Sequence, residues 1–276
     1  MINILHLSDV HFPSENFAIT ERELKYGIIN FLNSIDDNQV YLLISGDITL
    51  KGEKKGYQEA YMFFEDIIKG TNGKIHKDNI LLCPGNHDIV KESYFKDFNE
   101  FSYKLRNDNA FLYGVHSSVT SLQKENVFFL GINSVYHLNH EYGLVNIDDI
   151  EYVLKNASIS PLTRKIAFTH HHLINQFVKD TSSIRNAHQL LLLLDHYGFE
   201  AIFHGHQHTS TKLVLGESNM ITVGVSTPGL EMQGYTNGFN YYSINEKDIK
   251  IDKYIYSRDA HVSGKTGNFI KLPYIF

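Results

Sequence analysis

Residues 79–88, Asn-Ile-Leu-Leu-Cys-Pro-Gly-Asn-His-Asp, decide how the whole chain is interpreted. The mainly apolar run at 79–83 predicts a short buried strand, because such runs fit the interior of a sheet when turn residues bound them. Pro84 and Gly85 then end the strand and turn the backbone. The turn presents an amide, an imidazole and a carboxylate in succession. In open α/β sheets, polar groups at the carboxyl end of a buried strand mark the place where ligands bind.

Four further polar clusters follow predicted strands in the same way. The strands are predicted at 2–7, 40–44, 165–169 and 200–203. The clusters are Asp9-Val10-His11, Gly46-Asp47 with Gly52 five residues on, His170-His171-His172, and Gly205-His206-Gln207-His208. Each cluster alone is a weak signal, because Asp-x-His and His-x-His also arise by chance. Five clusters in this order, each after a strand, indicate one composite functional site.

Strands and helices alternate through the first two thirds of the chain. A capping box at Thr20–Glu23 begins the first predicted helix. Apolar residues at helical spacing predict helices at 24–35, 57–68, 92–105, 147–154 and 182–197, and a further strand is predicted at 127–132. From residue 211 onward the pattern changes to short strands at 212–215, 220–223, 239–244 and 250–256. We therefore expect an α/β protein built as two sheets packed face to face with helices outside.

No linker, repeat or low-complexity segment interrupts this pattern. We expect a single domain over residues 1–276, with a βα core at 1–209 that carries the site and a β-rich tail at 210–276. With 42% hydrophobic residues, including 17 Tyr and 18 Phe, the chain can fill a sizeable core. No run approaches the roughly 20 apolar residues that a membrane span requires.

Charge and cysteine content narrow the functional classes. The net charge of −6, from 25 basic and 31 acidic residues, argues against a broad binding surface for duplex nucleic acid. It does not exclude a nuclease whose metal ions attract the phosphate. The single cysteine, Cys83, cannot form an internal disulfide, and a secretory cleavage after roughly 15–30 residues would remove the polar cluster that starts at His6. Both observations favour a cytoplasmic protein, and neither predicts an oligomeric state.

Mixed imidazole and carboxylate side chains favour two transition-metal ions, Mn, Fe, Co or Zn, over Ca or Mg. The ions of a two-metal centre lie about 3.5–4 Å apart, so that one ligand must touch both. Asp47 is the natural bridge because its short carboxylate offers two oxygens, and Asn86 adds a neutral amide oxygen. With Asp9 and Asp47 as the anionic ligands, two divalent ions leave the site positive. Such a site suits an anionic phosphate ester.

The order D-x-H, G-D-x4-G, G-N-H-D, H and G-H-x-H over residues 6–208 resembles the calcineurin-like metallophosphoesterase superfamily. The resemblance implies a four-layered αββα sandwich of two mixed sheets with flanking helices, in which the tail at 210–276 completes the second sheet. One metal ion is then expected on Asp9, His11, Asp47 and His208. The other is expected on Asp47, Asn86, His171 and His206.

The resemblance also suggests roles for the histidines outside these two sets. His87 is expected to contact the substrate together with Asn86 and to donate a proton to the leaving oxygen. The family usually has a proline two residues after the fourth-cluster histidine, and alignment on a His-His-Pro pattern selects His171. Because this chain lacks that proline, His170 is the alternative. Asp88 is expected to cap the following helix, with orientation of His87 as the alternative role.

We therefore expect a metal-dependent phosphoric ester hydrolase, in which a bridging water of lowered pKa attacks phosphorus in line. Residues 181–187, Thr-Ser-Ser-Ile-Arg-Asn-Ala, resemble a Ser-Leu-Arg-Asn-Ala segment of bacterial cyclic-nucleotide phosphodiesterases in this superfamily. This resemblance predicts a phosphodiesterase for small nucleotides, with 3′,5′-cyclic AMP as the lead substrate. Arg185 would bind the substrate through its fork of donors, and Asn186 could follow it.

Two other functions stay open at this point. The same chemistry could act on other esters, as in a nuclease or a phosphomonoesterase. The chain could instead be an inactive binding scaffold. Family scaffolds have typically lost ligands or the histidine that does not bind metal, whereas this sequence keeps all of them.

Overall fold

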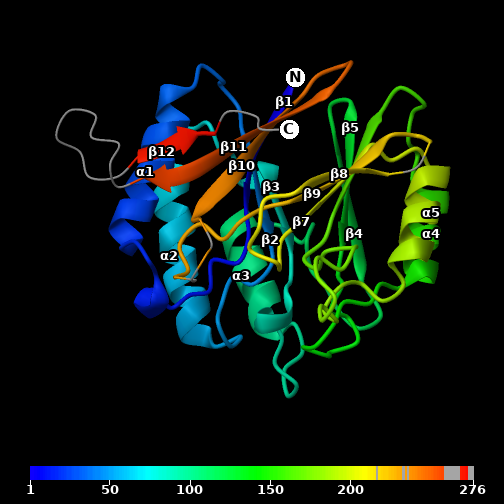
Figure 1. Ribbon diagram of the computed structural model, residues 1–276, viewed down its shortest axis with the longest axis horizontal. Helices are drawn as coiled ribbons and strands as arrows, with labels where there is room; N and C mark the ends of the chain where they lie inside the picture. Colours follow the sequence, from blue (N-terminus) through cyan, green and yellow to red (C-terminus); the bar gives the residue numbers. More distant parts are fainter. Residues whose placement is uncertain (216, 232–233, 235, 258–267, 273–276) are drawn as a thin grey trace.

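Two sheets of six strands each form the centre of the computed structural model, which describes residues 1–276 apart from 216, 232–233, 235, 258–267 and 273–276 (Figure 1). The first sheet contains, in spatial order, β12 (Asn268–Lys271), β11 (Ile249–Ser257), β10 (Gly238–Ile244), β1 (Ile2–Leu7), β2 (Tyr41–Ser45) and β3 (Ile80–Cys83). The second sheet contains β4 (Val119–Lys124), β5 (Val127–Ile132), β6 (Arg164–Phe168), β7 (Ala201–His204), β9 (Met220–Gly224) and β8 (Lys212–Leu215).

Both sheets are mixed, as predicted. In the first sheet β1, β2 and β3 are parallel and β10 pairs antiparallel with β1. In the second sheet β5, β6, β7 and β9 are parallel, and β4 and β8 pair antiparallel at the two edges. Every residue of β1, β2, β3, β5 and β7 is buried, because these strands are covered on both faces.

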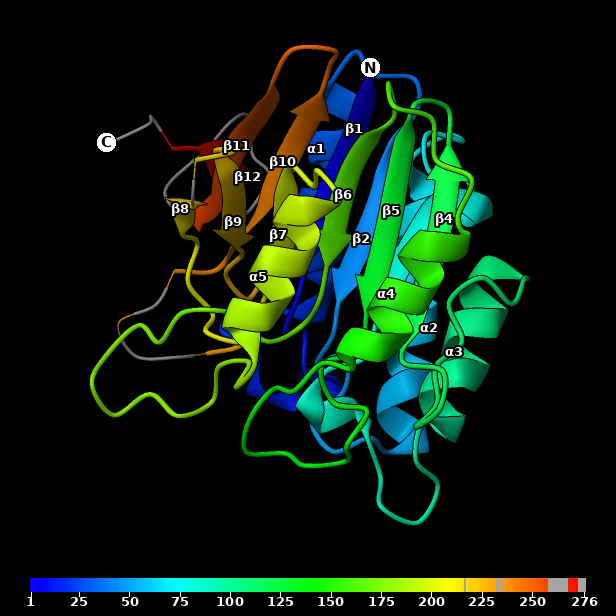
Figure 2. The ribbon, with the colours of Figure 1, turned by 90° about the vertical axis from the view of Figure 1, so that its right-hand side faces the viewer.

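Helices cover the outer face of each sheet and complete the four layers (Figures 1 and 2). On the first sheet lie α1 (Glu21–Ser34), α2 (Lys54–Gly70) and α3 (Lys96–Arg106), and on the second lie α4 (Ile147–Asn156) and α5 (Ala187–His196). Single-turn 3₁₀ helices occur at η1 (Ser14–Asn16), η2 (Lys77–Asn79) and η3 (Asn86–Asp88). The capping box predicted at Thr20 is confirmed, since Thr20 and Glu23 exchange side-chain to backbone hydrogen bonds.

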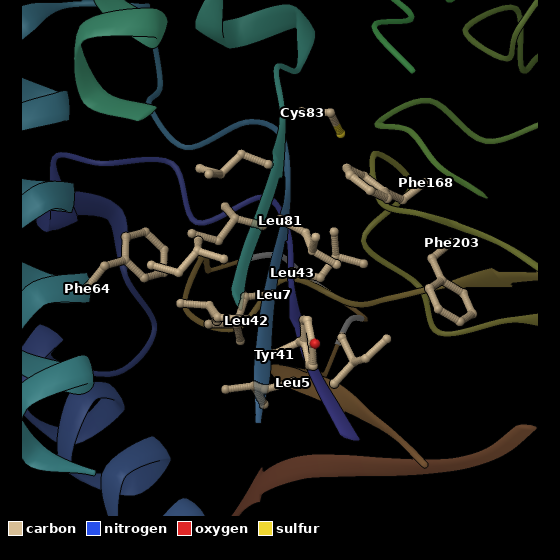
Figure 3. Packing of buried hydrophobic residues seen from close by; sticks show 14 of the residues in the cluster. Leu5, Leu7, Tyr41, Leu42, Leu43, Phe64, Leu81, Cys83, Phe168 and Phe203 are labelled. Atoms are coloured by element: carbon tan, nitrogen blue, oxygen red, sulfur yellow. The ribbon is translucent and has the colours of Figure 1, made fainter. Parts of the chain in front are cut away.

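The strands of the second sheet divide their side chains between two cores. Phe129, Phe168 and Phe203 belong to the cluster that includes the first sheet, while Phe128 and Ile202 pack in the cluster of α4 and α5. Phe168 and Phe203 lie opposite the apolar side chains of the first sheet in Figure 3. This alternation follows from the period of two in a strand, and it holds the two sheets face to face.

The C-terminal strands differ from the expectation. We expected the tail at 210–276 to complete the second sheet, and this is wrong for the strands beyond Gly224. While β8 and β9 do extend the second sheet, β10, β11 and β12 extend the first. The reason is that β1 has an open edge, on which β10 pairs over the full length from Ile2 to His6. The tail therefore binds both halves of the sandwich together.

Two helices begin later than predicted. The third starts at Lys96 instead of 92, and the last starts at Ala187 instead of 182. Ile184 forms a parallel bridge with Gly143, and residues 185–186 form a turn, so that the helix begins only at Ala187. Strands β4 and β12 were not predicted. Both lie at a sheet edge, and β4 alternates buried and exposed residues. No helix among the described residues is long and apolar enough to cross a membrane.

Candidate metal centre

The five sequence clusters meet at one end of the sandwich. Each begins within two residues of the end of its strand, namely β1, β2, β3, β6 or β7. The carboxyl ends of β2, β5 and β6 point to the same end of the molecule in Figure 2. Strands of both sheets thus contribute side chains to one region, which is where open α/β sheets bind ligands.

The backbone at this end is in an unusual conformation. Five residues of the predicted site have positive φ without being glycine, with values of 57°, 57°, 49°, 71° and 55° for Asp9, His11, Asp47, His206 and His208. Such a conformation is unfavourable for an L residue and tends to cluster at functional sites. Backbone hydrogen bonds from Asp9 to Gly46 and from His11 to Asp47, both 3.0 Å, fix the first two clusters against each other.

The first ligand group consists of Asp9, His11 and His208, whose ligand atoms all lie within 4.8 Å of one another. Nε2 of His208 lies 3.1 Å from Oδ1 of Asp9 and 3.5 Å from Nε2 of His11. Asp9 and His11 are buried and His208 is partly exposed. One carboxylate oxygen and two imidazole nitrogens therefore converge on one small volume that borders solvent, which suits a transition-metal ion.

The second ligand group consists of Asp47, His170 and His206, with Asn86 beside them. Nε2 of His170 lies 3.3 Å from Oδ2 of Asp47, 3.1 Å from Oδ1 of Asn86 and 3.2 Å from Nδ1 of His206. Oδ2 of Asp47 also lies 3.8 Å from Nε2 of His11 in the first group. Asp47 is thus placed between the two groups, in the position that a bridging ligand requires.

The geometry favours His170 over His171 in the second group, contrary to our alignment on the His-His-Pro pattern. Nδ1 of His170 donates a hydrogen bond to the carbonyl of Ser45 at 2.8 Å, which leaves Nε2 facing Asp47 and Asn86. Nδ1 of His171 instead lies 2.9 Å from Oγ of Ser134. The ring of His171 packs against that of His206, with 4.3 Å between centroids, without entering the group.

Two glycines allow the backbone to approach the carboxylates. A Cβ at Gly85 would collide with the side chain of Asp47, and a Cβ at Gly205 would collide with Asp9 and Ser8. These collisions explain why a glycine directly precedes Asn86 and His206. The donor set, the burial and the close packing all fit two metal ions.

Charges in the two groups depend on one another. Burial opposes ionisation of Asp47, but the imidazoles of His170, His87 and His11 outweigh it and hold the pKa of Asp47 well below its usual value. Burial also favours neutral His170, yet the Asp47 carboxylate raises the pKa of His170 to about 9. Burial lowers the pKa of His206 to about 3. A metal ion in the second group must therefore displace a proton from His170.

His87 lies at the edge of the two groups and is half-buried. Its backbone N–H donates to Oδ1 of Asp47 at 2.8 Å, and its ring lies edge-on to that of His11 with 5.1 Å between centroids. Nδ1 lies 2.7 Å from the carbonyl of Leu50. Since a carbonyl can only accept, Nδ1 carries a proton, and Nε2 is left for exchange with another group.

Asp88 neither caps α3 nor orients His87, so both expected roles are wrong. Its carboxylate accepts hydrogen bonds from the backbone N–H groups of Gly85, Ile48 and Thr49, at 3.0, 3.2 and 3.0 Å. Burial, followed by the charge of Asp47, raises the pKa of Asp88 to about 6. Asp88 therefore ties the loop after β3 to the loop after β2.

Arg185 is exposed and stacks on Tyr142, with Cζ 3.3 Å from the ring centroid. Its backbone N–H donates to the carbonyl of Gly143 at 2.8 Å, and a Cβ at Gly143 would stand 2.7 Å from Cβ of His171. Arg185 is thus outside the two ligand groups but on the loop that packs against His171. Tyr142 was missed in the sequence, where no motif surrounds it.

Asn186 has a structural role instead of the substrate role considered for it. Its Oδ1 accepts from the backbone N–H of Val145 at 3.1 Å, and its Nδ2 donates to the carbonyl of Val145 at 2.8 Å. This paired contact fixes the segment before α5 against the loop after β5. It therefore places Arg185 without leaving the Asn186 amide free for a ligand.

Comparisons with known proteins agree with this geometry. Residues 2–210 match the family described as calcineurin-like phosphoesterase. An uncharacterized metallophosphoesterase-like protein YydB of Bacillus subtilis (strain 168) is 33% identical over 92 residues, which cover 33% of this chain and 18% of that protein. The match thus spans less than a fifth of that relative's length.

Solved structures show the same fold. Purple acid phosphatase PPD1 from yellow lupin (Lupinus luteus) seeds matches with a TM-score of 0.64 at 15% identity, over 98% of this chain and 53% of that one. A dimetal phosphatase from Danio rerio matches with a TM-score of 0.56 at 12% identity, over 91% and 95% of the two chains. The chain belongs to the calcineurin-like phosphoesterase family, and two groups of its side chains could each hold a metal ion.

Proposed function

We propose that the enzyme is a phosphodiesterase that hydrolyses small nucleotides, with 3′,5′-cyclic AMP as the lead substrate. The observation that carries this proposal is the exposed guanidinium of Arg185, which stacks on the Tyr142 ring and whose backbone is bonded to Gly143, the residue that packs against His171. Among the described residues, no carboxylate forms an ion pair with it. A pre-oriented cation of this kind suits the phosphate or the base of a nucleotide.

We assign one ion to Asp9, His11, Asp47 and His208, and the other to Asp47, Asn86, His170 and His206. Mixed nitrogen and oxygen donors favour Mn, Fe, Co or Zn. When bound, two such ions supply Lewis-acid stabilisation of the phosphoryl oxygens and a nucleophile at neutral pH. Asp47 would hold the two ions together, since its Oδ2 lies 3.3 Å from Nε2 of His170 and 3.8 Å from Nε2 of His11.

His87 is proposed to protonate the leaving oxygen. The carbonyl of Leu50 accepts from Nδ1 at 2.7 Å and fixes the ring orientation. When His87 is an imidazolium, this carbonyl also stabilises the proton on Nδ1, while Nε2 offers its proton to the substrate. The half-exposed position of the ring allows the proton to be replaced from solvent after each turnover.

Arg185 is proposed to bind the substrate rather than to take part in bond cleavage. It lies outside both ligand groups, and its ring contact with Tyr142 limits the side-chain freedom that binding would otherwise remove. Asn86 is proposed to bind the second ion, since its Oδ1 lies 3.1 Å from Nε2 of His170, and we propose that it also contacts the substrate. Selectivity for small nucleotides would then reside in the loop before α5.

The Mn²⁺-loaded enzyme tests this proposal in two stages. Bis(4-nitrophenyl) phosphate is compared first with 4-nitrophenyl phosphate, and the preferred class is then extended to cyclic nucleotides and single-stranded DNA. We expect faster turnover of the diester and the highest kcat/KM for a cyclic nucleotide. Equal or faster turnover of the monoester would identify a phosphomonoesterase, and preference for DNA would identify a nuclease. Location in the cytoplasm stays a prediction, for which cell fractionation is the test.

A further inference from the structure

A chain of buried hydrogen bonds joins the C-terminal tail to the second ligand group. The hydroxyl of Tyr242 on β10 lies 2.8 Å from Nδ1 of His6 on β1, and Nε2 of His6 lies 2.7 Å from Oγ of Ser45 at the end of β2. The carbonyl of Ser45 accepts from Nδ1 of His170 at 2.8 Å. Tyr242, His6, Ser45 and His170 have no exposed surface. The path from the tail to the ligand is therefore shielded from water.

The protons in this chain have a defined order. Nδ2 of Asn240 donates to the hydroxyl of Tyr242 at 3.1 Å and to the carbonyl of Gly224 at 3.0 Å, while its Oδ1 accepts from Oγ of Ser210 at 3.0 Å. With Asn240 donating to the Tyr242 hydroxyl, the arrangement that fits these contacts has the hydroxyl directing its single proton to Nδ1 of His6. His6 then carries its own proton on Nε2 and donates it to Ser45. Burial, followed by the charge of His204, lowers the pKa of His6 to about 3, so that the ring stays neutral.

The carbonyl of Ser45 is held at several points. The hydroxyl of Ser8 donates to it at 3.0 Å, in addition to His170. The hydroxyl of Ser45 accepts a hydrogen bond from Nε2 of His6. A partner that orients a metal-binding histidine through its second ring nitrogen fixes the direction of the nitrogen that binds the metal. The position of Ser45 therefore decides where Nε2 of His170 points.

We propose that Tyr242 and His6 are positioning residues of the metal centre, which act on His170 through Ser45. Tyr242 selects the tautomer of His6, and His6 holds Ser45 in the place from which its carbonyl orients His170. The inference rests on the proposed assignment of His170 to the second ion. It extends the metal centre to residues beyond 2–210, the part of the chain that matches the family.

The neighbouring tyrosine provides a matched control. Tyr241 is also buried, and its hydroxyl donates to Oδ2 of Asp37 at 2.8 Å, without a hydrogen bond among the described residues to His6 or Ser45. Tyr241→Phe and Tyr242→Phe thus each remove one hydrogen-bonded hydroxyl from β10. Any general loosening of the strand should affect both variants, whereas an effect on His170 should be confined to Tyr242→Phe.

The experiment is a titration of the full chain with Co²⁺, in which binding is measured by calorimetry and by visible absorption. Asn86→Ala first identifies the binding event of the second ion, since Asn86 is assigned to that ion alone. We expect Tyr242→Phe to lower the affinity for the second ion about tenfold, which is the lower end of the effect that such outer partners of a metal-binding histidine have. The absorption spectrum of Co²⁺ in the second group should change as well. In Tyr242→Phe the affinity for the first ion should stay within about twofold of that of the unmodified protein. In Tyr241→Phe the affinities for both ions should stay within the same range.

A double-mutant cycle with Ser45→Ala tests the path itself, and Ser45→Ala serves alone if Tyr242→Phe does not fold. Ser45→Ala removes the hydroxyl that His6 contacts and keeps the carbonyl that His170 contacts. If the residues act in one chain, the double variant should bind the second ion no more weakly than the weaker single variant. Additive effects, equal losses in Tyr241→Phe, or unchanged affinity in Ser45→Ala would overturn the inference.

Failure of the inference can be told apart from failure of the proposed function. If the unmodified chain binds two Co²⁺ ions and Tyr242→Phe binds them equally well, only the positioning role is lost. If the unmodified chain has no binding event that Asn86→Ala removes, the ligand assignment fails, and the positioning role fails with it.

Discussion

The two sheets contribute unlike halves to one site. Ligand candidates after β1, β2 and β3 are almost completely buried, with 0%, 3%, 2% and 6% exposure for Asp9, His11, Asp47 and Asn86. Their loops are tied to one another by backbone hydrogen bonds and by the carboxylate of Asp88. After β6, in contrast, the chain makes a long excursion before α5, in which residues 174–179 are exposed (Figure 2).

This contrast suggests a division of labour. The half from the first sheet is buried, and its loops are hydrogen-bonded to one another. This rigid half suits ligands that must hold two cations at a fixed separation. The half from the second sheet combines His170, His206 and His208 with the exposed loop that ends at Arg185. Substitutions in the first half should therefore abolish metal binding or chemistry, whereas substitutions in the loop should change which substrate is preferred.

Loss of the bridging carboxylate should have the largest effect. Asp47→Asn keeps the shape of the side chain but removes the charge that both ligand groups share, and we expect kcat to fall by about 1,000-fold or more. Metal analysis of the purified variant should show fewer than two ions per chain. Asp66→Asn, on the exposed part of α2, is the control for loss of a carboxylate. Two tightly bound ions in Asp47→Asn would refute the bridging role.

His87→Ala should separate chemistry from metal binding. We expect both ions to be retained and kcat to fall by about 10²–10⁴-fold on a substrate with an alkoxide leaving group. The loss should be smaller with a nitrophenolate leaving group, which needs no proton. His140→Ala, at an exposed position in the loop after β5, is the control. Loss of an ion in His87→Ala would show that His87 is a ligand rather than an acid.

Much of the rigid half could be predicted from the sequence. Asp9, His11, Asp47 and Asn86 each follow an apolar strand directly, and their place at the sheet end follows from strand topology alone. Burial of the parallel strands could also be predicted from the sequence, because both faces of those strands are apolar.

The second half could be predicted less well, for physical reasons. Three successive histidines follow β6, and only the hydrogen bond from Nδ1 of His170 to Ser45, 125 residues away, selects one of them. The segment before α5 has residues that also fit a helix start, and the bridge between Ile184 and Gly143 is a tertiary contact. Two further features are tertiary contacts and therefore cannot be predicted from neighbouring residues in the sequence. They are the stacking of Arg185 on Tyr142 and the division of the C-terminal strands between the two sheets.

Arg185→Ala should affect the loop half of the site alone. We expect KM for a cyclic nucleotide to rise about tenfold, with kcat changed less, because the guanidinium would bind the substrate in the ground state and the transition state alike. Tyr142→Phe keeps the ring under Arg185 and should stay near the unmodified KM. Tyr142→Ala removes the ring and should raise KM by a few-fold, in line with an exposed cation–π contact. Unchanged KM in Arg185→Ala would remove Arg185 from the substrate site.

The smallest expected effect is a pH dependence of stability that distinguishes the metal-free from the metal-bound enzyme. His170 has a folded-state pKa of about 9, above the ordinary value of 6.5, so its contribution is fully present below pH 6.5 and is lost as the pH rises through 9. Burial lowers the pKa of His11 to about 4, and the same holds for His206 at about 3, so these rings oppose folding as the pH falls below 6.5. The Tm of the metal-free enzyme should therefore be highest near neutral pH and fall on both sides.

Bound metal should remove the alkaline part of this profile. A metal ion on His170 would take the place of its proton, and an ion on His208, whose pKa the charge of Asp9 raises despite burial, would do the same in the first group. Scanning calorimetry from pH 5 to 10, with Mn²⁺ and with a chelator, measures both profiles. His171→Asn should keep the full alkaline fall in the chelated enzyme, whereas His170→Asn should reduce it to the part that His208 contributes, because the charge of Asp9 outweighs burial and raises the pKa of His208 as well. If instead the fall is as large in His170→Asn as in the unmodified enzyme, His170 does not contribute to it, and the rigid half of the site does not set the charge of the histidine that faces it.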